Sequence, residues 1–159
     1  MSVVRAALAE YESDPEYDKI YCVFDRDTHA TYQAALQHIQ QHKLFKAKKL
    51  FGITSEPCFE IWLLLHFMYS AAPFKAAGKK SSCDRLLDEI RKIPGLKNYE
   101  KGFQDIYTLV GSQTSTAIKN GTRLSKENAA SESTNPSTKM HLLATYLHNL
   151  AKKKIGSGK

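Results

Sequence analysis

The chain has 159 residues, 42% of them hydrophobic, and carries 23 Lys and Arg against 16 Asp and Glu, a formal net charge of +7. This length predicts a single domain over residues 1–154, with a flexible tail at 155–159. The longest apolar run, residues 61–68, is too short to span a bilayer, and the first residues lack the layout of a signal peptide. The positive charge favours a polyanionic partner, most often nucleic acid, and a merely basic surface is the alternative.

The cysteines set an expectation about redox state. Cys22, Cys58 and Cys83 are odd in number and lack the spacing of a metal-binding motif. Neither a disulfide framework nor a zinc finger is indicated. The simplest interpretation is a reduced, cytoplasmic protein.

Apolar patterns in the first third of the chain predict alternating helices and strands. We expect a helix over 2–12, a buried strand at about 18–24, a helix over 29–42 and a second strand over 50–54. A strand, a helix and a strand with short connections form a βαβ unit with parallel strands. The predicted fold class is therefore α/β.

The rest of the chain is predicted to be mainly helical. A helix over 59–68, opened by Pro57, is apolar on nearly all sides and must be buried. Residues 70–82 read as a mobile basic loop, and loops of that length are often functional. Further helices are expected over 82–92, 102–111, 113–130 and 137–153. The apolar stripe of the last helix is predicted to be core: Met140, Leu143, Ala144, Leu147, Leu150 and Ala151.

Two carboxylates stand at the end of the first predicted strand. Asp25 and Asp27 are two residues apart and point to the same side of a strand end. Hard cations such as Mg²⁺ are usually held by one or two carboxylates together with substrate phosphates. The pair therefore predicts a divalent metal site, and a solvated turn in which one Asp caps the next helix is the alternative.

Glu60 is the acidic exception on the buried helix that follows the second strand. Parallel strands end at one edge of a sheet, so Ser55, Glu56 and Glu60 are expected beside Asp25 and Asp27. An unpaired buried carboxylate is costly. Glu60 therefore lies near the exposed helix end, pairs with a basic side chain, or faces a metal.

Basic residues outside this edge are candidates for binding phosphates. Lys119, Arg123 and Lys126 fall at i, i+4 and i+7 of one predicted helix, a spacing that suits either a phosphate backbone or a solvated face. His29 follows the acidic pair and is placed for proton transfer or phosphate contact. The predicted nucleic-acid contacts are Arg26, His29, Lys75, Lys79, Lys80, Lys119 and Arg123.

Four stretches of the sequence resemble the RloB-like family in order and spacing. They are residues 23–27 (Val-Phe-Asp-Arg-Asp), 55–67, 99–101 (Tyr-Glu-Lys) and 135–143, and the second is long and specific. The resemblance implies a Toprim-like domain that uses Mg²⁺ or Mn²⁺ for phosphoryl-transfer chemistry. It also implies a role in antiphage defence, often encoded beside an AAA-type ATPase.

Carried over residue by residue, the resemblance assigns the metal to Asp25 and Asp27 and the family's downstream acidic position to Glu60. Glu60 would complete the metal shell or act as a base. The expected activity is cleavage of phosphodiester bonds in RNA or DNA.

The sequence departs from the family pattern in two places. The family's N-terminal strand, with its Glu-Gly and Thr-Glu signature, has no counterpart here, so its usual general base is expected to be missing. Glu56 stands where the family more often has Asn. Two strands alone are too few for a stable sheet, so one edge is expected to be exposed or paired with another molecule, including a second copy of the chain.

Two other functions fit parts of the sequence. The run Phe24-Asp25-Arg26-Asp27-Thr28 also resembles the nucleophile motif of haloacid-dehalogenase-like phosphatases, but His29 stands where that family has Thr or Val, and no late acidic pair follows. The other alternative is a non-catalytic module that binds nucleic acid or a partner ATPase, which the missing glutamate favours.

Overall fold

The computed structural model describes residues 2–26 and 30–156, and it is a mixed α/β fold. The longer helices agree with the prediction except at their ends, whereas the short helix at Lys43–Lys46 was not predicted. In chain order the elements are α1 (Ser2–Ser13), β1 (Ile20–Asp25), α2 (Tyr32–Gln41), α3 (Lys43–Lys46), β2 (Leu50–Glu56), α4 (Glu60–Phe67), α5 (Ser82–Ile90), α6 (Ile106–Val110), the 3₁₀ helix η1 (Gly111–Gln113), α7 (Thr114–Ser131), β3 (Ser137–Thr138) and α8 (Met140–Gly156).

The sheet has the order β1-β2-β3, with β2 at its centre. β1 and β2 are parallel and pair from Ile20 with Leu50 to Asp25 with Ser55. The βαβ prediction is thereby confirmed. β3 joins the other edge of β2 in the antiparallel direction.

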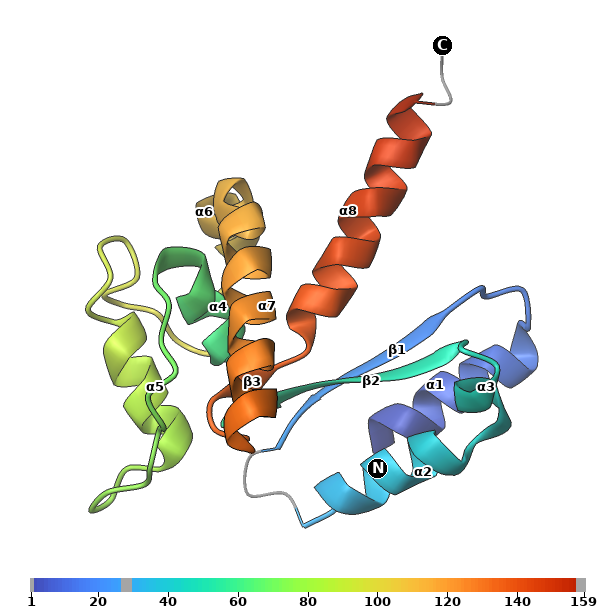
Figure 1. Cartoon of the computed structure of the whole chain (residues 1–159), viewed down its shortest axis with the longest axis horizontal. Coiled ribbons are helices and arrows are strands. Elements are labelled where there is room, and N and C mark those ends of the chain that lie inside the picture. The colour runs from blue at the N-terminus through green and yellow to red at the C-terminus, as the bar shows by residue number, and fades with distance from the viewer. Residues whose placement is uncertain (1, 27–29, 157–159) are drawn as a thin grey trace.

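The N-terminal half packs its helices on one face of β1 and β2 (Figure 1). Side chains alternate between faces along a strand, so Ile20, Cys22 and Phe24 point to the same side. They meet Val4 of α1 and Ile39 of α2, both of which are buried. This small core holds α1, α2 and α3 beneath the parallel strands.

The C-terminal half has its own core, centred on α4. Every residue of α4 except Phe67 is buried, which confirms the prediction of an apolar helix enclosed on all sides. α4 packs against α5 and α7, and Asn120 Nδ2 of α7 donates a hydrogen bond to the Leu65 carbonyl oxygen over 2.9 Å. α5 begins in a capping box in which Ser81 and Asp84 bond reciprocally, a strong helix-start signal.

The segment between α4 and α5 is a loop, as predicted, and it is anchored at Phe74. Phe74 is buried, and its backbone N–H donates to Asn135 Oδ1 over 3.1 Å. Asn135 Nδ2 donates in return to the Phe74 carbonyl oxygen over 2.7 Å. A loop far from residue 135 in sequence is thus tied to the segment that leads into β3.

Some predicted helix starts are wrong. Residues 137–138 form β3 instead of the first turn of the last helix, because the edge of β2 offers backbone partners to Ser137 and Thr138. Pro57 lies before α4, which begins at Glu60. α6 is shorter than the helix predicted over 102–111, since Gly102 and Asp105 have positive φ angles.

The prediction that the apolar stripe of α8 is core is also wrong. Leu147 is 54% exposed and Leu150 is 41% exposed. Every residue of the stripe except Leu150 instead lines one wall of an open groove of about 640 Å³, whose other walls include Trp62 of α4 and Tyr107 of α6. Figure 1 shows why: α8 leaves the body of the molecule and only its first turns lie near β2 and α7. Within the two described segments, no helix has the length and apolar character needed to cross a membrane.

The close approach of α7 and α8 at Gly121 can be tested by substitution. A Cβ placed on Gly121 would lie 2.8 Å from the Cβ of His141, which the backbone of α8 holds in place. Overpacking costs about 1–3 kcal/mol, whereas replacing a helical glycine by alanine gains up to about 1 kcal/mol. We therefore expect Gly121→Ala to lower the free energy of unfolding by on the order of 1 kcal/mol in a denaturant titration.

The matched control is Thr116→Ala, at an exposed position of the same helix. It should leave the unfolding midpoint nearly unchanged. A Gly121→Ala protein more stable than the wild type would show that α8 does not press on α7 at this point.

Candidate site at the carboxyl edge of the sheet

Three oxygen-bearing side chains lie in a row where β1 and β2 end. Asp25 is the register partner of Ser55, and Ser55 is the register partner of Thr138 in β3. Cross-strand partners carry their side chains on the same face of a sheet. We call Asp25, Ser55 and Thr138 the polar row.

Two members of the polar row are buried and fixed. The hydroxyl oxygens of Ser55 and Thr138 lie 3.0 Å apart and share a hydrogen bond. Thr138 Oγ1 also accepts from the backbone N–H of Met140, the first residue of α8, over 3.1 Å. The start of α8 therefore sets the position of the row.

His141 secures the same strand from the first turn of α8. Its Nδ1 lies 3.0 Å from the Thr138 carbonyl oxygen. A carbonyl only accepts, so Nδ1 carries the proton of the neutral ring. Burial lowers the pKa of His141, and this keeps the ring neutral at physiological pH.

Arg26 and Glu56 form an ion pair one residue beyond the polar row, at the carboxyl edge of the sheet. Arg26 Nη1 donates to both carboxylate oxygens of Glu56, over 2.8 and 2.7 Å, and to Thr134 Oγ1 over 3.3 Å. The hydrogen bonds to Glu56 and its negative charge raise the pKa of the Arg26 guanidinium. Glu56, which departs from the family pattern, thus gains a partner that sequence reasoning missed. The available signal was a pair of opposite charges at the carboxyl ends of two strands predicted to pair.

A polar pocket of about 340 Å³ opens beside this ion pair. Strand alternation turns Arg26 and Glu56 away from the polar row, toward α2. Tyr32 and Gln33 of α2 line one side of the pocket, and Asn128 of α7 and Lys139 line another. The edge therefore offers carboxylate and hydroxyl oxygens, and a charged hollow lies beside them with Thr138 of the polar row in its lining.

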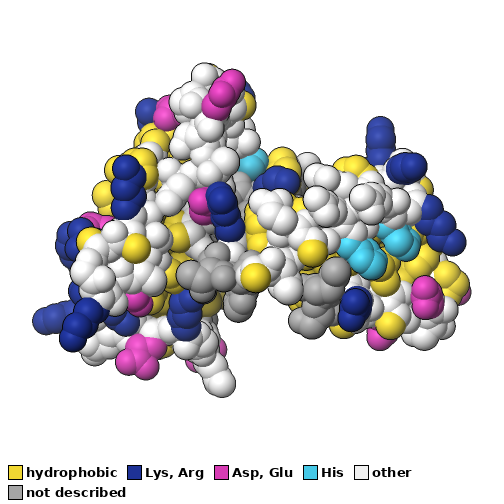
Figure 2. Space-filling view, turned by 90° about the horizontal axis from the view of Figure 1, so that it is seen from below, with side chains coloured by type: hydrophobic (Ala, Val, Ile, Leu, Met, Phe, Trp, Pro, Cys, Tyr) yellow, Lys and Arg dark blue, Asp and Glu magenta, His cyan; other side chains and the backbone are white. Residues whose placement is uncertain are grey.

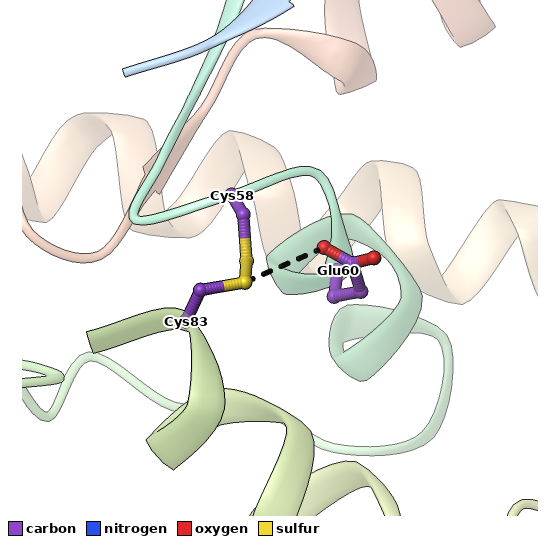
Figure 3. Close-up of side chains that lie close together, drawn as sticks. All are labelled: Cys58, Glu60 and Cys83. Carbon is purple, nitrogen blue, oxygen red and sulfur yellow. Dashed lines mark hydrogen bonds between the residues drawn. A yellow bond between two sulfur atoms is a disulfide. The ribbon is translucent and has the colours of Figure 1, made fainter. Parts of the chain in front are cut away.

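Glu60 does not join this edge. The residue is 4% exposed, and its side chain lies beside the disulfide between Cys58 and Cys83 (Figure 3). Among the described residues, the potential metal ligands that lie close together in a group of three are Cys58, Glu60 and Cys83. Asp25 is not part of this group. The expectation of three cysteines in the reduced state is wrong here, because the starts of α4 and α5 bring two cysteines together from 25 residues apart.

The remaining contacts of Glu60 are long. Tyr99 Oη donates to Glu60 Oε1 over 3.5 Å, and Lys101 Nζ lies 4.0 Å from Oε2. Burial and the charge of Glu60 raise the pKa of Tyr99 to about 12. Cys83 Sγ lies 3.9 Å from Glu60 Oε2, and a disulfide sulfur has no proton to donate.

The predicted nucleic-acid contacts fall into two groups. Lys80 pairs with Asp88 over 2.8 Å, and Arg123 pairs with Glu127 over 2.8 Å while its guanidinium lies 3.8 Å from the ring centroid of Tyr69. Lys75, Lys79 and Lys119 are exposed and have no ion-pair partner among the residues that the structure describes. Asp27 and His29 lie outside the described residues, and their assigned roles stay predictions.

On the face that Figure 2 shows, basic side chains are spread out rather than gathered in one stripe. Figure 2 shows Lys and Arg side chains on both halves of one face, with acidic side chains among them. This face therefore does not mark a single track for a nucleic-acid backbone.

The parallel strand pair and the oxygen donors at its carboxyl edge define the chain as an α/β protein with a candidate site for a hard cation. A family model for RloB-like protein matches residues 1–147. The chain therefore belongs to the RloB-like family, which confirms the resemblance seen in the sequence. No curated protein and no solved structure gave a significant match.

A substitution of Thr138 tests whether the hydrogen bonds of the polar row stabilise the fold. Valine has the shape of threonine but lacks the hydroxyl, so Thr138→Val leaves Ser55 Oγ and the Met140 N–H without their partner. An unsatisfied buried polar group costs about 1–3 kcal/mol. We expect Thr138→Val to lower the free energy of unfolding by roughly that amount.

Thr138→Ser is the matched control, because it keeps the hydroxyl and removes only a methyl group. It should cost less than Thr138→Val in the same denaturant titration. If the valine variant is as stable as the wild type, the hydroxyl pair does not hold β3 to β2.

Proposed function

We propose that this protein is a divalent-metal-dependent nuclease whose centre lies at the carboxyl edge of β1 and β2. The observation that carries the proposal is the position of Asp25 in register with the buried hydroxyls of Ser55 and Thr138. Carboxylate and hydroxyl oxygens are hard ligands, and this donor set suits Mg²⁺ or Mn²⁺ better than a soft metal. Asp25 and Asp27 would hold the ion.

The bound ion would supply Lewis-acid charge stabilisation and a nucleophilic water at the scissile phosphate. The protein's own residues have three tasks: to hold Asp25 in place, to hold the chain that follows it, and to attract the substrate. Asp25 keeps its place because β1 is fixed to β2 up to that residue, and the backbone N–H of Arg26 donates to the Ser55 carbonyl oxygen over 2.8 Å. The ion pair of Arg26 with Glu56 holds the chain as it leaves the strand.

The third task is to attract and orient a polyanion. Lys75, Lys79 and Lys119 are exposed without acidic partners in the described chain, and Lys139 lines the pocket beside the edge. Arg123 and Lys80 would exchange their acidic partners for phosphates on binding. The net charge of +7 supports RNA or DNA as the substrate.

Family membership supports a role in antiphage defence together with an AAA-type ATPase partner. Membership covers residues 1–147 and includes both acidic positions of the first strand end. These two assignments rest on the family alone, and they go beyond the chemistry of the edge.

One observation favours a second candidate function, a non-catalytic module that binds nucleic acid or a partner ATPase. Glu60 belongs to the cysteine cluster, and Glu56 is engaged by Arg26. Among the described residues, neither is placed as a general base beside Asp25. A protein with this arrangement could bind a phosphate backbone without cutting it.

The activity test uses Asp25→Asn. We expect the wild-type chain to cleave pooled tRNA, single-stranded DNA or duplex DNA in Mg²⁺ or Mn²⁺ and to stop in EDTA. Asp25→Asn should reduce the cleavage rate by about a hundredfold or more, because the isosteric amide carries no charge to hold the ion. Product formation on denaturing gels gives the rate.

The matched control is Asp18→Asn, which removes the same charge at an exposed position before β1. It should cleave at the wild-type rate. Retention of each nucleic acid on a filter is measured in parallel. Binding without metal-dependent cleavage would overturn the nuclease and support the binding module. Cleavage by Asp25→Asn at the wild-type rate would place the metal away from Asp25.

A further inference from the structure

A second cluster of potential ligands lies apart from the polar row, at the start of α4. One donor atom from each of Cys58, Glu60 and Cys83 lies within 4.8 Å of the others. Their exposed fractions are 0%, 4% and 5%. Figure 3 shows the Glu60 carboxylate directed toward the sulfur of Cys83.

The buried carboxylate at the centre of this cluster is poorly matched to its surroundings. A strong N–H···O⁻ or O–H···O⁻ bond is about 2.5–2.9 Å long. Glu60 instead has a Tyr99 hydroxyl at 3.5 Å and a Lys101 ammonium at 4.0 Å, and the Lys101 side chain is 50% exposed. Burying a carboxylate without close partners is costly, so this site favours a closer cation than the structure provides.

We propose that reduction of the Cys58–Cys83 disulfide creates a zinc site formed by Cys58, Cys83 and Glu60. Zinc takes sulfur and carboxylate oxygen ligands and is usually four-coordinate and tetrahedral. The fourth position is open to the Tyr99 hydroxyl or to water, since Lys101 links the cluster to the surface. This inference goes beyond the nuclease proposal and rests on different residues from the polar row.

The proposed chemistry has two steps, reduction of the disulfide and binding of zinc. A dithiol reductant gives two electrons and two protons to the disulfide, which becomes two thiols while the reductant becomes a disulfide itself. Zinc then displaces the two thiol protons to solvent, and the thiolates and the Glu60 carboxylate bind the ion. Metal binding to the reduced cluster therefore weakens as the pH falls.

The cluster would join α4 to α5 in both redox states. In the oxidised chain the link is the covalent bond between Cys58 and Cys83. In the reduced chain the ion would take over this link, because one thiolate comes from each helix start. Thiolates prefer zinc to Mg²⁺, so the two proposed centres would not compete for one ion.

The test uses Co²⁺ as a spectroscopic substitute for zinc on the full chain. The disulfide is reduced with a water-soluble phosphine, which takes its oxygen from water and offers no thiol to the metal. The reduced wild type should develop an intense thiolate-to-cobalt absorption band in the near ultraviolet, which saturates when one Co²⁺ per chain is bound at the cluster. Added zinc should abolish the band.

The oxidised wild type is the first control, because it has the same sequence and no thiolate at the cluster. It should show no such band. In the reduced state, Cys58→Ser and Cys83→Ser should lose most of the band, and Glu60→Gln should weaken Co²⁺ binding by about tenfold or more. Cys22→Ser, at the buried free cysteine, and Asp25→Asn should both give the same thiolate-to-cobalt band as the wild type.

Far-ultraviolet circular dichroism of each protein checks the fold. The proposal is overturned if the reduced wild type unfolds, gives no thiolate-to-cobalt band, or gives a band that depends on Cys22 instead of Cys83. Because Asp25 is not in the cluster, loss of nuclease activity in Asp25→Asn with a normal thiolate-to-cobalt band would separate the two proposals.

Discussion

Strand β2 forms backbone hydrogen bonds along both of its edges, and both halves of the fold are built around it. Along one edge β2 pairs with β1 from Leu50 to Ser55, and at its carboxyl end the other edge takes the two residues of β3. The N-terminal helices pack on the strand pair, while α4 continues directly from β2 into the second core. The end of β2 is therefore where two halves of the chain, each with its own core, are joined.

This junction explains why two chemically different clusters lie close in sequence and apart in the fold. Ser55 belongs to the polar row, while Glu60, five residues later, sits in the first turn of α4 beside two sulfurs. The chain turns away from the sheet between them. Oxygen donors at the sheet edge suit a hard cation, and thiols with one carboxylate suit zinc. Sequence proximity alone would have merged the two sets into one site.

Sequence patterns were sufficient to predict those helices and strands that depend mainly on residues close together in the chain. The apolar runs ending at Phe24 and Thr54 predicted the parallel pair, and the composition of residues 59–68 predicted a buried helix. They failed where distant segments meet. β3 is two residues long and exists only because β2 has a free edge. The Cys58–Cys83 disulfide joins helix starts 25 residues apart. The apolar stripe of α8 resembles a core face, although Leu147 is largely exposed. The pairing of Arg26 with Glu56 across 30 residues belongs to the same class.

We propose that Asp25 holds a hard divalent cation at the carboxyl edge of the sheet, and binding of Mn²⁺ can be measured there without any substrate. Free Mn²⁺ gives a six-line electron paramagnetic resonance signal that weakens when the ion is bound. We expect the oxidised wild-type chain and its Glu60→Gln variant to remove Mn²⁺ from solution equally, and Asp25→Asn to leave it free. Equal binding by wild type and Asp25→Asn, with loss in Glu60→Gln, would contradict the account and place the metal centre at the start of α4.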